Sequence, residues 1–126
     1  MPTTETAVMT TQEVADRFYE LCKSYNWEGA QDELYDKNAV SIEPPDSPGL
    51  YSVEGLDEIK KKGVTFNNMV EEMHGGYVNE PIVAGKHFAV AMGMDVTMKG
   101  MGRSQMDEIA VYEVKDGKIV KEQFFF

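Results

Sequence analysis

Asp107-Glu-Ile-Ala-Val-Tyr-Glu-Val-Lys-Asp-Gly-Lys-Ile-Val-Lys-Glu-Gln-Phe-Phe-Phe126 is the stretch that decides the fold. Two runs rich in β-branched and aromatic residues flank Asp116-Gly117. Asp-Gly between such runs is a strong hairpin signal, because both turn positions favour positive φ. The final strand is aromatic to its last residue, so helices from earlier in the chain or another subunit must cover it. The sequence therefore predicts a chain that ends in a long antiparallel hairpin against an apolar layer.

A second long strand is predicted from His87 to Lys99, because large apolar residues alternate there with small or polar ones. Successive side chains of a strand point to opposite faces, so the large residues share one face. We expect that face to meet helices and the flatter face to suit a second sheet from another subunit. The large face consists of Phe88, Val90, Met92, Met94, Val96 and Met98.

Helices are predicted in the first half of the chain. Thr10 and Glu13 have capping-box spacing and precede apolar residues that recur at helical spacing. We expect Asn26 to cap a second, short helix that ends near Leu34. A third helix is predicted from about residue 56 to residue 70, where apolar residues again share one face.

The remaining segments complete the expected architecture. Ala39 to Glu43 is predicted as a short strand that Pro44-Pro45 ends, because proline cannot donate to a sheet. Residues 46–55 form a loop rich in Pro, Gly and Ser that could act as a lid. Met73 to Val83 is predicted as a strand with a bulge near Gly75-Gly76. This order indicates an α+β cone, with three N-terminal helices packed on the concave face of a curved antiparallel sheet and a pocket at its open end.

Composition and charge limit the possible functions. A chain of 126 residues, 42% hydrophobic, is long enough for one core, and we expect a frayed tail over residues 1–9 and a single domain over residues 10–126. No apolar run approaches the ~20 residues of a membrane span, so no membrane association is expected. The net charge of -10 argues against nucleic-acid binding, which requires clustered Lys and Arg. The lack of signal-peptide features and the single Cys22 favour a cytoplasmic location.

The chain resembles the SnoaL-like group of the NTF2-like (nuclear transport factor 2-like) superfamily. The resemblance covers most of the chain from about residue 10 and is carried by residues 13–21, 27–36, 39–44, 54–56, 88–95 and 108–126. It implies the α+β cone fold and a homodimer formed through the outer face of the sheet. The superfamily contains ketosteroid isomerases, polyketide cyclases, epoxide hydrolases, dehydratases and non-catalytic binding modules, so the fold constrains function only weakly.

Comparison with the ketosteroid isomerases of this superfamily gives one match and two mismatches. Glu43 falls at the position of their general base, at the end of a similar strand. Their oxyanion hole uses a tyrosine and a protonated aspartic acid, and the matching positions here are Phe18 and Ala110. Neither residue has a side chain that can donate a hydrogen bond. The resemblance therefore places a general base at Glu43. The lack of donors at Phe18 and Ala110 argues against steroid isomerisation by that route.

Four residues are candidates for acid–base chemistry. Glu43, pinned by two prolines beside the expected pocket, could move a proton next to a carbonyl group. Strand alternation places Glu108 and Glu122 on inward faces, where either could share a proton with Glu43. His74 could shuttle protons near neutral pH. The alternative for Glu43 is a solvated strand end, for the other two glutamates a place at the rim, and for the histidine a structural role.

A second group of residues is expected to line the pocket. Methionines along the strand from His87 to Lys99 would make a soft, adaptable wall for a flat apolar ligand, although ordinary core filling explains such methionines as well. Tyr51 lies on the possible lid and could close over a ligand. The expected pocket residues are Phe18, Tyr51, Phe66, Met92, Met94, Ala110, Tyr112 and Phe124.

The function predicted from these features is binding of a small hydrophobic or aromatic carbonyl compound, with proton transfer by Glu43 as in an isomerase, cyclase or dehydratase. No metal or cofactor is expected, because no Cys/His cluster has zinc spacing and no phosphate-binding loop appears. The alternative is a non-catalytic binding or dimerisation module, which fits the missing donors at Phe18 and Ala110. A structural adaptor is a third possibility, and it would need an exposed apolar patch beyond the dimer face.

Overall fold

The structure is a computed structural model that describes residues 8–47 and 49–126. The predicted tail over residues 1–9 therefore lies mostly outside the described residues. Within the described ranges the elements are α1 (Thr11–Cys22), α2 (Trp27–Leu34), β1 (Tyr35–Ile42), β2 (Val53–Glu54), α3 (Leu56–Met69), β3 (Val70–Val78), β4 (Ile82–Ala84), β5 (His87–Met98), β6 (Gly102–Lys115) and β7 (Lys118–Phe125).

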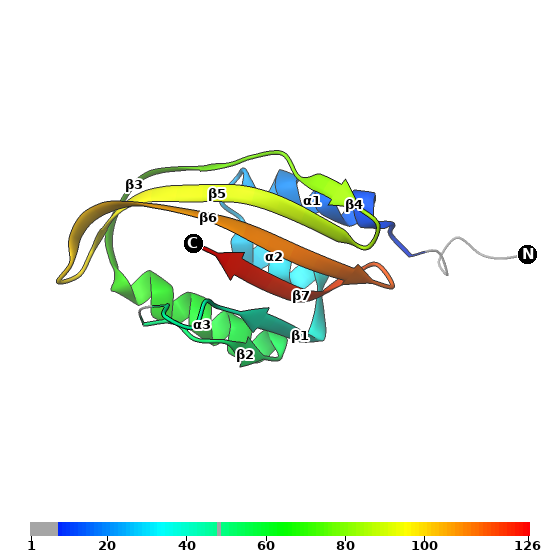
Figure 1. Cartoon of the computed structure of the whole chain (residues 1–126), viewed down its shortest axis with the longest axis horizontal. Helices are drawn as coiled ribbons and strands as arrows, with labels where there is room; N and C mark the ends of the chain where they lie inside the picture. Colours follow the sequence, from blue (N-terminus) through cyan, green and yellow to red (C-terminus); the bar gives the residue numbers. More distant parts are fainter. Residues whose placement is uncertain (1–7, 48) are drawn as a thin grey trace, which may run out of the picture.

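The strands form one curved sheet with the order β2-β1-β7-β6-β5-β3, and β4 pairs with β5 at its side. The three helices pack on this sheet, as Figure 1 shows, so the predicted α+β cone is confirmed. The sheet is mixed rather than purely antiparallel, because β1 runs parallel to β7 and pairs Ser41 with Glu122. This parallel pairing joins the first long strand to the last one, and it decides which side chains meet in the cavity described below.

The local signals in the sequence act as expected. Asp116 (φ 52°) and Gly117 (φ 76°) both have positive φ and connect β6 to β7 in an antiparallel hairpin. Thr10 and Glu13 form a reciprocal capping box at the start of α1. The side chain of Asn26 accepts a hydrogen bond from the backbone N–H of Gly29 and begins α2. These contacts satisfy turn and helix-end groups that would otherwise lack partners.

Three boundaries differ from the sequence prediction. β1 begins at Tyr35, four residues before the predicted start, because a polar stretch there pairs with β7 across an irregular register. The predicted strand from Met73 to Val83 is divided into β3 and β4, and the register of β3 shifts between Met73 and Gly75, where a bulge was predicted. The possible lid contains β2, which pairs with β1 and ties the second half of the loop to the sheet.

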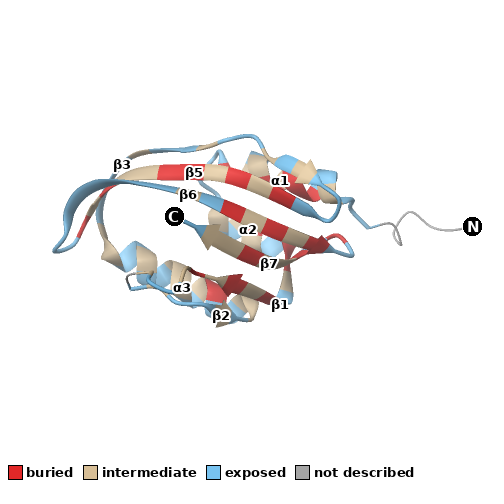
Figure 2. Ribbon diagram, viewed as in Figure 1, coloured by how far each residue is buried: buried red, intermediate tan, exposed pale blue. Residues whose placement is uncertain are grey.

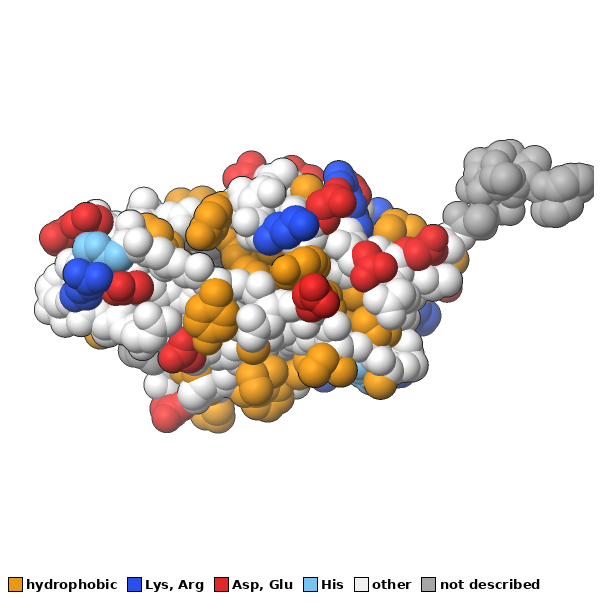
Figure 3. All heavy atoms as spheres, turned by 90° about the horizontal axis from the view of Figure 1, so that it is seen from above, with side chains coloured by type: hydrophobic (Ala, Val, Ile, Leu, Met, Phe, Trp, Pro, Cys, Tyr) orange, Lys and Arg blue, Asp and Glu red, His pale blue; other side chains and the backbone are white. Residues whose placement is uncertain are grey.

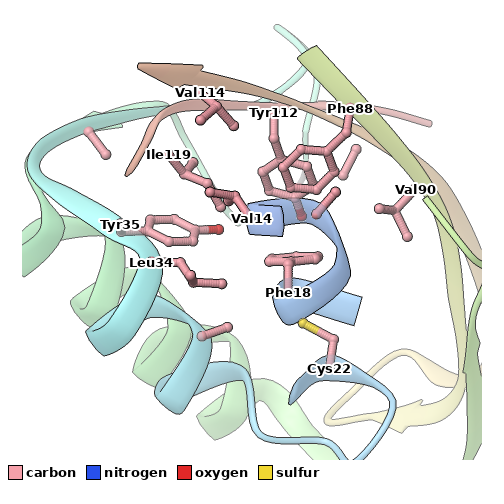
Figure 4. Packing of buried hydrophobic residues seen from close by; sticks show 14 of the residues in the cluster. Val14, Phe18, Cys22, Leu34, Tyr35, Phe88, Val90, Tyr112, Val114 and Ile119 are labelled. Atoms are coloured by element: carbon pink, nitrogen blue, oxygen red, sulfur yellow. The ribbon is translucent and has the colours of Figure 1, made fainter. Parts of the chain in front are cut away.

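The core lies between α1, α2 and the middle of the sheet. Phe18 of α1 packs against Phe88 and Tyr112, with ring centroids 5.5 and 4.6 Å away, and Figure 4 shows these rings together. Val14 and Cys22 are fully buried on the same helix face. In Figure 2 buried residues lie along β1, β5 and β7 and in the second half of β6, while the turn between β5 and β6 is exposed. The core therefore fills one end of the cone and leaves the other end open.

No helix among the described residues is long and apolar enough to cross a membrane.

Candidate functional site

A cavity of about 1190 Å³ opens beside the core, between the helices and the concave side of the sheet. Its volume exceeds the roughly 300–1,000 Å³ of a typical small-molecule site. The walls are mostly aromatic and methionine side chains, including Phe18, Trp27, Phe124, Met92 and Met94. Several charged side chains also reach this cavity, and Glu43, Glu108, Glu122 and Lys62 are the ones that could perform chemistry.

Glu43 lies just beyond the end of β1 and faces the cavity. Its side chain is only 6% exposed, and its Oε2 atom accepts a hydrogen bond from Nζ of Lys62 at 2.8 Å. The backbone N–H of Glu43 donates to Oγ of Ser52 at 2.9 Å, which fixes the chain at this point. The Lys62 ammonium also donates to Oγ of Ser41 at 2.5 Å. Glu43 is thus a buried carboxylate whose charge is compensated by a lysine from α3.

Glu122 lies next to this ion pair and is almost fully buried. Ser41 donates to its Oε2 atom at 2.7 Å, and the hydroxyl of Tyr35 donates to Oε1. The parallel pairing of β1 with β7 places Ser41 directly beside Glu122. Burial raises the pKa of Glu122, while the two hydroxyl donors act against this rise. A continuous chain of contacts therefore runs from Tyr35 through Glu122, Ser41 and Lys62 to Glu43.

Glu108 of β6 is the third carboxyl group on the cavity. Burial raises its pKa to about 7, the negative charges of Glu43 and Glu122 add to the rise, and Lys62 opposes it. Among the described residues no hydrogen-bonding partner holds this carboxyl group in place. Near neutral pH it therefore carries a proton part of the time and is free to meet a ligand.

Most of the residues expected at the site line the cavity. The carboxyl groups of Glu43, Glu108 and Glu122 are brought together there, although they come from three different strands or strand ends. The other expected residues that line it are Phe18, Phe66, Met92, Met94, Tyr112 and Phe124.

Three expected residues lie elsewhere. His74 is outside the cavity lining, and its Nε2 atom lies 2.8 Å from Oγ1 of Thr97, on the face of β5 opposite the helices. The register of β3 shifts between Met73 and Gly75, on either side of His74. Tyr51 is 73% exposed and lies outside the cavity lining, although its neighbour Leu50 lines the cavity. Ala110 is fully buried in the core, and its methyl group is too short to reach the cavity.

Lys62 was not among the residues predicted for the site, and it lies in the run Lys60-Lys61-Lys62 on α3. Lys60 and Lys61 do lie near the surface, paired with Asp32 and Glu58. Lys62 instead comes three residues after the buried Ile59 and four before Phe66, so it shares the apolar face of α3. That spacing is the signal that could have identified it.

Charged side chains of both signs lie on the face of the molecule shown in Figure 3. On the face shown in Figure 3, acidic side chains are dispersed, and the basic side chains of the described residues form no continuous stripe. Among residues 8–47 and 49–126, no group of three or more His, Cys, Asp or Glu side chains is arranged to hold a metal ion.

An α+β cone with a cavity between the helices and the sheet defines the NTF2-like class of proteins. The chain belongs to the SnoaL-like domain family, whose model matches residues 9–126. No match was found among curated proteins.

Solved structures agree with this assignment. A Mesorhizobium loti protein that carries the name SnoaL-like polyketide cyclase is 35% identical and has a TM-score of 0.87, with 94% of this chain and 100% of that chain covered. An NTF2-like protein of unknown function from Burkholderia pseudomallei is 20% identical, with a TM-score of 0.74 over 94% and 92% of the two chains. A Catenulispora acidiphila protein with a ketosteroid isomerase-like fold, in complex with trimethylamine, is 14% identical, with a TM-score of 0.70 over 93% and 87%. The last two are similar in fold alone.

Proposed function

We propose that this protein binds a small hydrophobic or aromatic carbonyl compound in the cavity and transfers a proton next to its carbonyl group, as an isomerase, cyclase or dehydratase does. The observation that carries the proposal is the pair of carboxyl groups on one cavity wall. Glu43 is ion-paired with Lys62, whereas the pKa of Glu108 is raised to about 7. Two carboxyl groups with such different environments are suited to act as base and acid.

In this proposal Glu43 is the general base and Glu108 is the general acid. The base would take a proton from the carbon next to the carbonyl group, and the acid would donate a hydrogen bond or a proton to the carbonyl oxygen. Glu108 precedes Ala110 by two residues on the same strand, so alternation gives both residues the same face. Glu108 can therefore supply the donor that the family resemblance places at Ala110 and that alanine lacks.

The chemistry of the cavity wall supports the choice of ligand. Aromatic and methionine side chains favour a flat apolar molecule. The three carboxyl groups, together with a net chain charge of -10, disfavour a carboxylate or a phosphate. The Mesorhizobium loti relative carries the name of a polyketide cyclase, an enzyme class whose substrates contain ketone groups, which is consistent with a carbonyl ligand.

Glu43→Gln is expected to slow proton transfer strongly in protein that circular dichroism shows to be folded. Glutamine has the same shape but cannot accept the proton, so the rate should fall by roughly 10²–10⁴-fold, the usual contribution of a general base. The measurement is exchange of protons for deuterium next to the carbonyl group in a panel of cyclic and aromatic ketones in heavy water, followed by proton NMR.

The matched control for this experiment is Glu71→Gln, which neutralises an exposed glutamate of β3. It should exchange ketone protons at the wild-type rate. Equal exchange by Glu43→Gln and wild-type protein would rule out Glu43 as the base.

The second candidate function is a binding module without catalysis, and the absence of donor side chains at Phe18 and Ala110 favours it. Trp27 lines the cavity, so its fluorescence should report ligand entry in either case. Ketones that quench this fluorescence but exchange no protons above the rate of buffer alone would favour the binding module over the enzyme.

We also infer a homodimer formed through the outer face of the sheet. Ile109 of β6 and Phe125 of β7 are direct neighbours in the sheet and are half exposed, which leaves an apolar strip on that face. Sedimentation should give the mass of a dimer for the wild-type protein and of a monomer for Ile109→Asp. A wild-type monomer at the highest soluble concentration would exclude this interface.

A further inference from the structure

Lys62 is a largely buried primary amine on a cavity wall, a position that a lysine rarely occupies. Its side chain is 10% exposed, and Nζ lies 5.6 Å from the ring centre of Phe124, which lines the same cavity. Two hydrogen bonds, to Ser41 and Glu43, hold the amine in place. An amine fixed beside a proton acceptor and an apolar binding space has the arrangement of a nucleophile for carbonyl carbon.

We propose that Lys62 forms a covalent imine with the carbonyl compound that enters the cavity. This inference rests on the proposed function only in taking the ligand to be a carbonyl compound. It adds a residue and a covalent step that proton transfer by Glu43 and Glu108 does not require.

The step balances with groups already at the site. Glu43, 2.8 Å from the ammonium nitrogen, takes a proton and leaves a neutral amine. The nitrogen lone pair forms a bond to the carbonyl carbon, and the oxygen, which receives the π electrons, takes a proton from Glu108. The nitrogen then gives a second proton to the ionised Glu108, and the protonated Glu43 returns its proton to the hydroxyl oxygen, which leaves as water when the carbon–oxygen bond breaks. One ammonium and one carbonyl group give one iminium and one water, with no change in oxidation state.

An imine at Lys62 would also stabilise the negative charge that proton removal leaves on the substrate, for which the site has few hydrogen-bond donors. Removing a proton next to a carbonyl group requires a place for the electrons that remain, and Glu108 offers one donor where the family resemblance places two, at Phe18 and Ala110. A positively charged iminium accepts those electrons directly. Glu43 would stay beside the new bond, in position to take the neighbouring proton.

The experiment is reductive trapping with benzaldehyde and sodium cyanoborohydride near neutral pH, followed by mass spectrometry of peptides. An imine that forms is reduced to a stable benzyl amine on the lysine that formed it. Lys61 lies next in the chain but is 74% exposed and outside the cavity lining, so it measures the rate of an ordinary surface lysine. We expect Lys62 to be labelled on the order of 10²-fold faster than Lys61, the rate gain of a positioned acid–base partner.

Three variants make this result specific. Lys62→Arg keeps a positive charge beside Glu43 but cannot form an imine, so the label in the peptide of residue 62 should disappear. Glu43→Gln removes the proton acceptor and should slow labelling of Lys62 on the order of 10²-fold. Lys61→Arg should leave labelling of Lys62 unchanged. Circular dichroism of each variant checks that the protein is folded.

Labelling of Lys62 no faster than that of Lys61 in folded wild-type protein would overturn the proposal. Ketone proton exchange that depends on Glu43 would still stand in that case, because it does not require the imine. Rapid labelling of Lys62 without any ketone proton exchange would support the imine and count against the proposed function.

Discussion

Replacing Lys62 by methionine is expected to lower the free energy of unfolding by about 3–5 kcal/mol, the usual cost of removing one partner from a buried ion pair. Methionine has a similar length and fits an apolar wall, so the loss would come from charge rather than from a void. The change leaves the Glu43 carboxylate, which is 6% exposed, beside Glu108 and Glu122 without its cation. It also removes the ammonium that donates to Ser41.

Urea unfolding of the variant measures this loss, with Lys61→Met as the matched control on the same helix. Lys61 pairs with Glu58 at the surface, where an ion pair contributes at most about 1 kcal/mol. The double variant Lys62→Met with Glu43→Gln removes both charges and should recover much of the lost stability. A loss below about 1 kcal/mol for Lys62→Met would mean that the ion pair is not buried in solution.

Replacing Glu108 by glutamine is expected to stabilise the protein above pH 7 and to have little effect at pH 4. The pKa of Glu108 is raised from 4.5 to about 7 in the folded protein, so the folded state holds its proton more tightly than the unfolded state does. The stability that this proton gives is complete below pH 4.5 and is lost as the pH rises through about 7. The shift corresponds to at most about 3 kcal/mol, which glutamine would restore at high pH.

The difference in unfolding free energy between wild type and Glu108→Gln, followed from pH 4 to pH 8, measures this effect. Taking this difference separates the contribution of Glu108 to the unfolding free energy from the general electrostatic repulsion in a chain with a net charge of -10. Glu71→Gln serves as control, because its target is exposed and its effect should not grow with pH. A constant difference across this range would show that Glu108 has an ordinary environment. If Glu108→Gln is more stable than the wild type and transfers protons more slowly, Glu108 serves function at the expense of stability, as residues of active sites often do.

The fold was predictable because its strongest signals are local. Asp116-Gly117 requires positive φ at two positions, and only a tight hairpin turn uses that geometry between two β-rich runs. Thr10 and Asn26 mark helix starts through hydrogen bonds to residues three positions away. The register of β1 with β7 has no such local signal. It joins residues about 80 positions apart, as in the contact of Ser41 with Glu122, and for this reason a parallel pair of strands was not expected.

The candidate site was predictable only in part, for the same reason. Strand alternation and the family resemblance pointed to Glu43, Glu108 and Glu122, which do line one cavity. Their partners come from other elements. Lys62 reaches Glu43 across the gap between α3 and β1, and Tyr35 reaches Glu122 from a stretch that was not recognised as a strand. Such contacts depend on how distant elements pack, which the spacing of residues within one element does not encode.

The central claim is that the cavity holds a carboxylic acid that keeps its proton near neutral pH beside an ion-paired carboxylate base. The most direct test needs no ligand: a carbon-13 NMR titration of the glutamate side-chain carboxyl carbons, with Glu108 assigned by its absence from the Glu108→Gln spectrum. The account predicts that the Glu108 signal titrates at a pH of about 7. Titration of that signal near the ordinary value of 4.5 would contradict the account, because Glu108 would then be ionised at neutral pH and could not act as the acid.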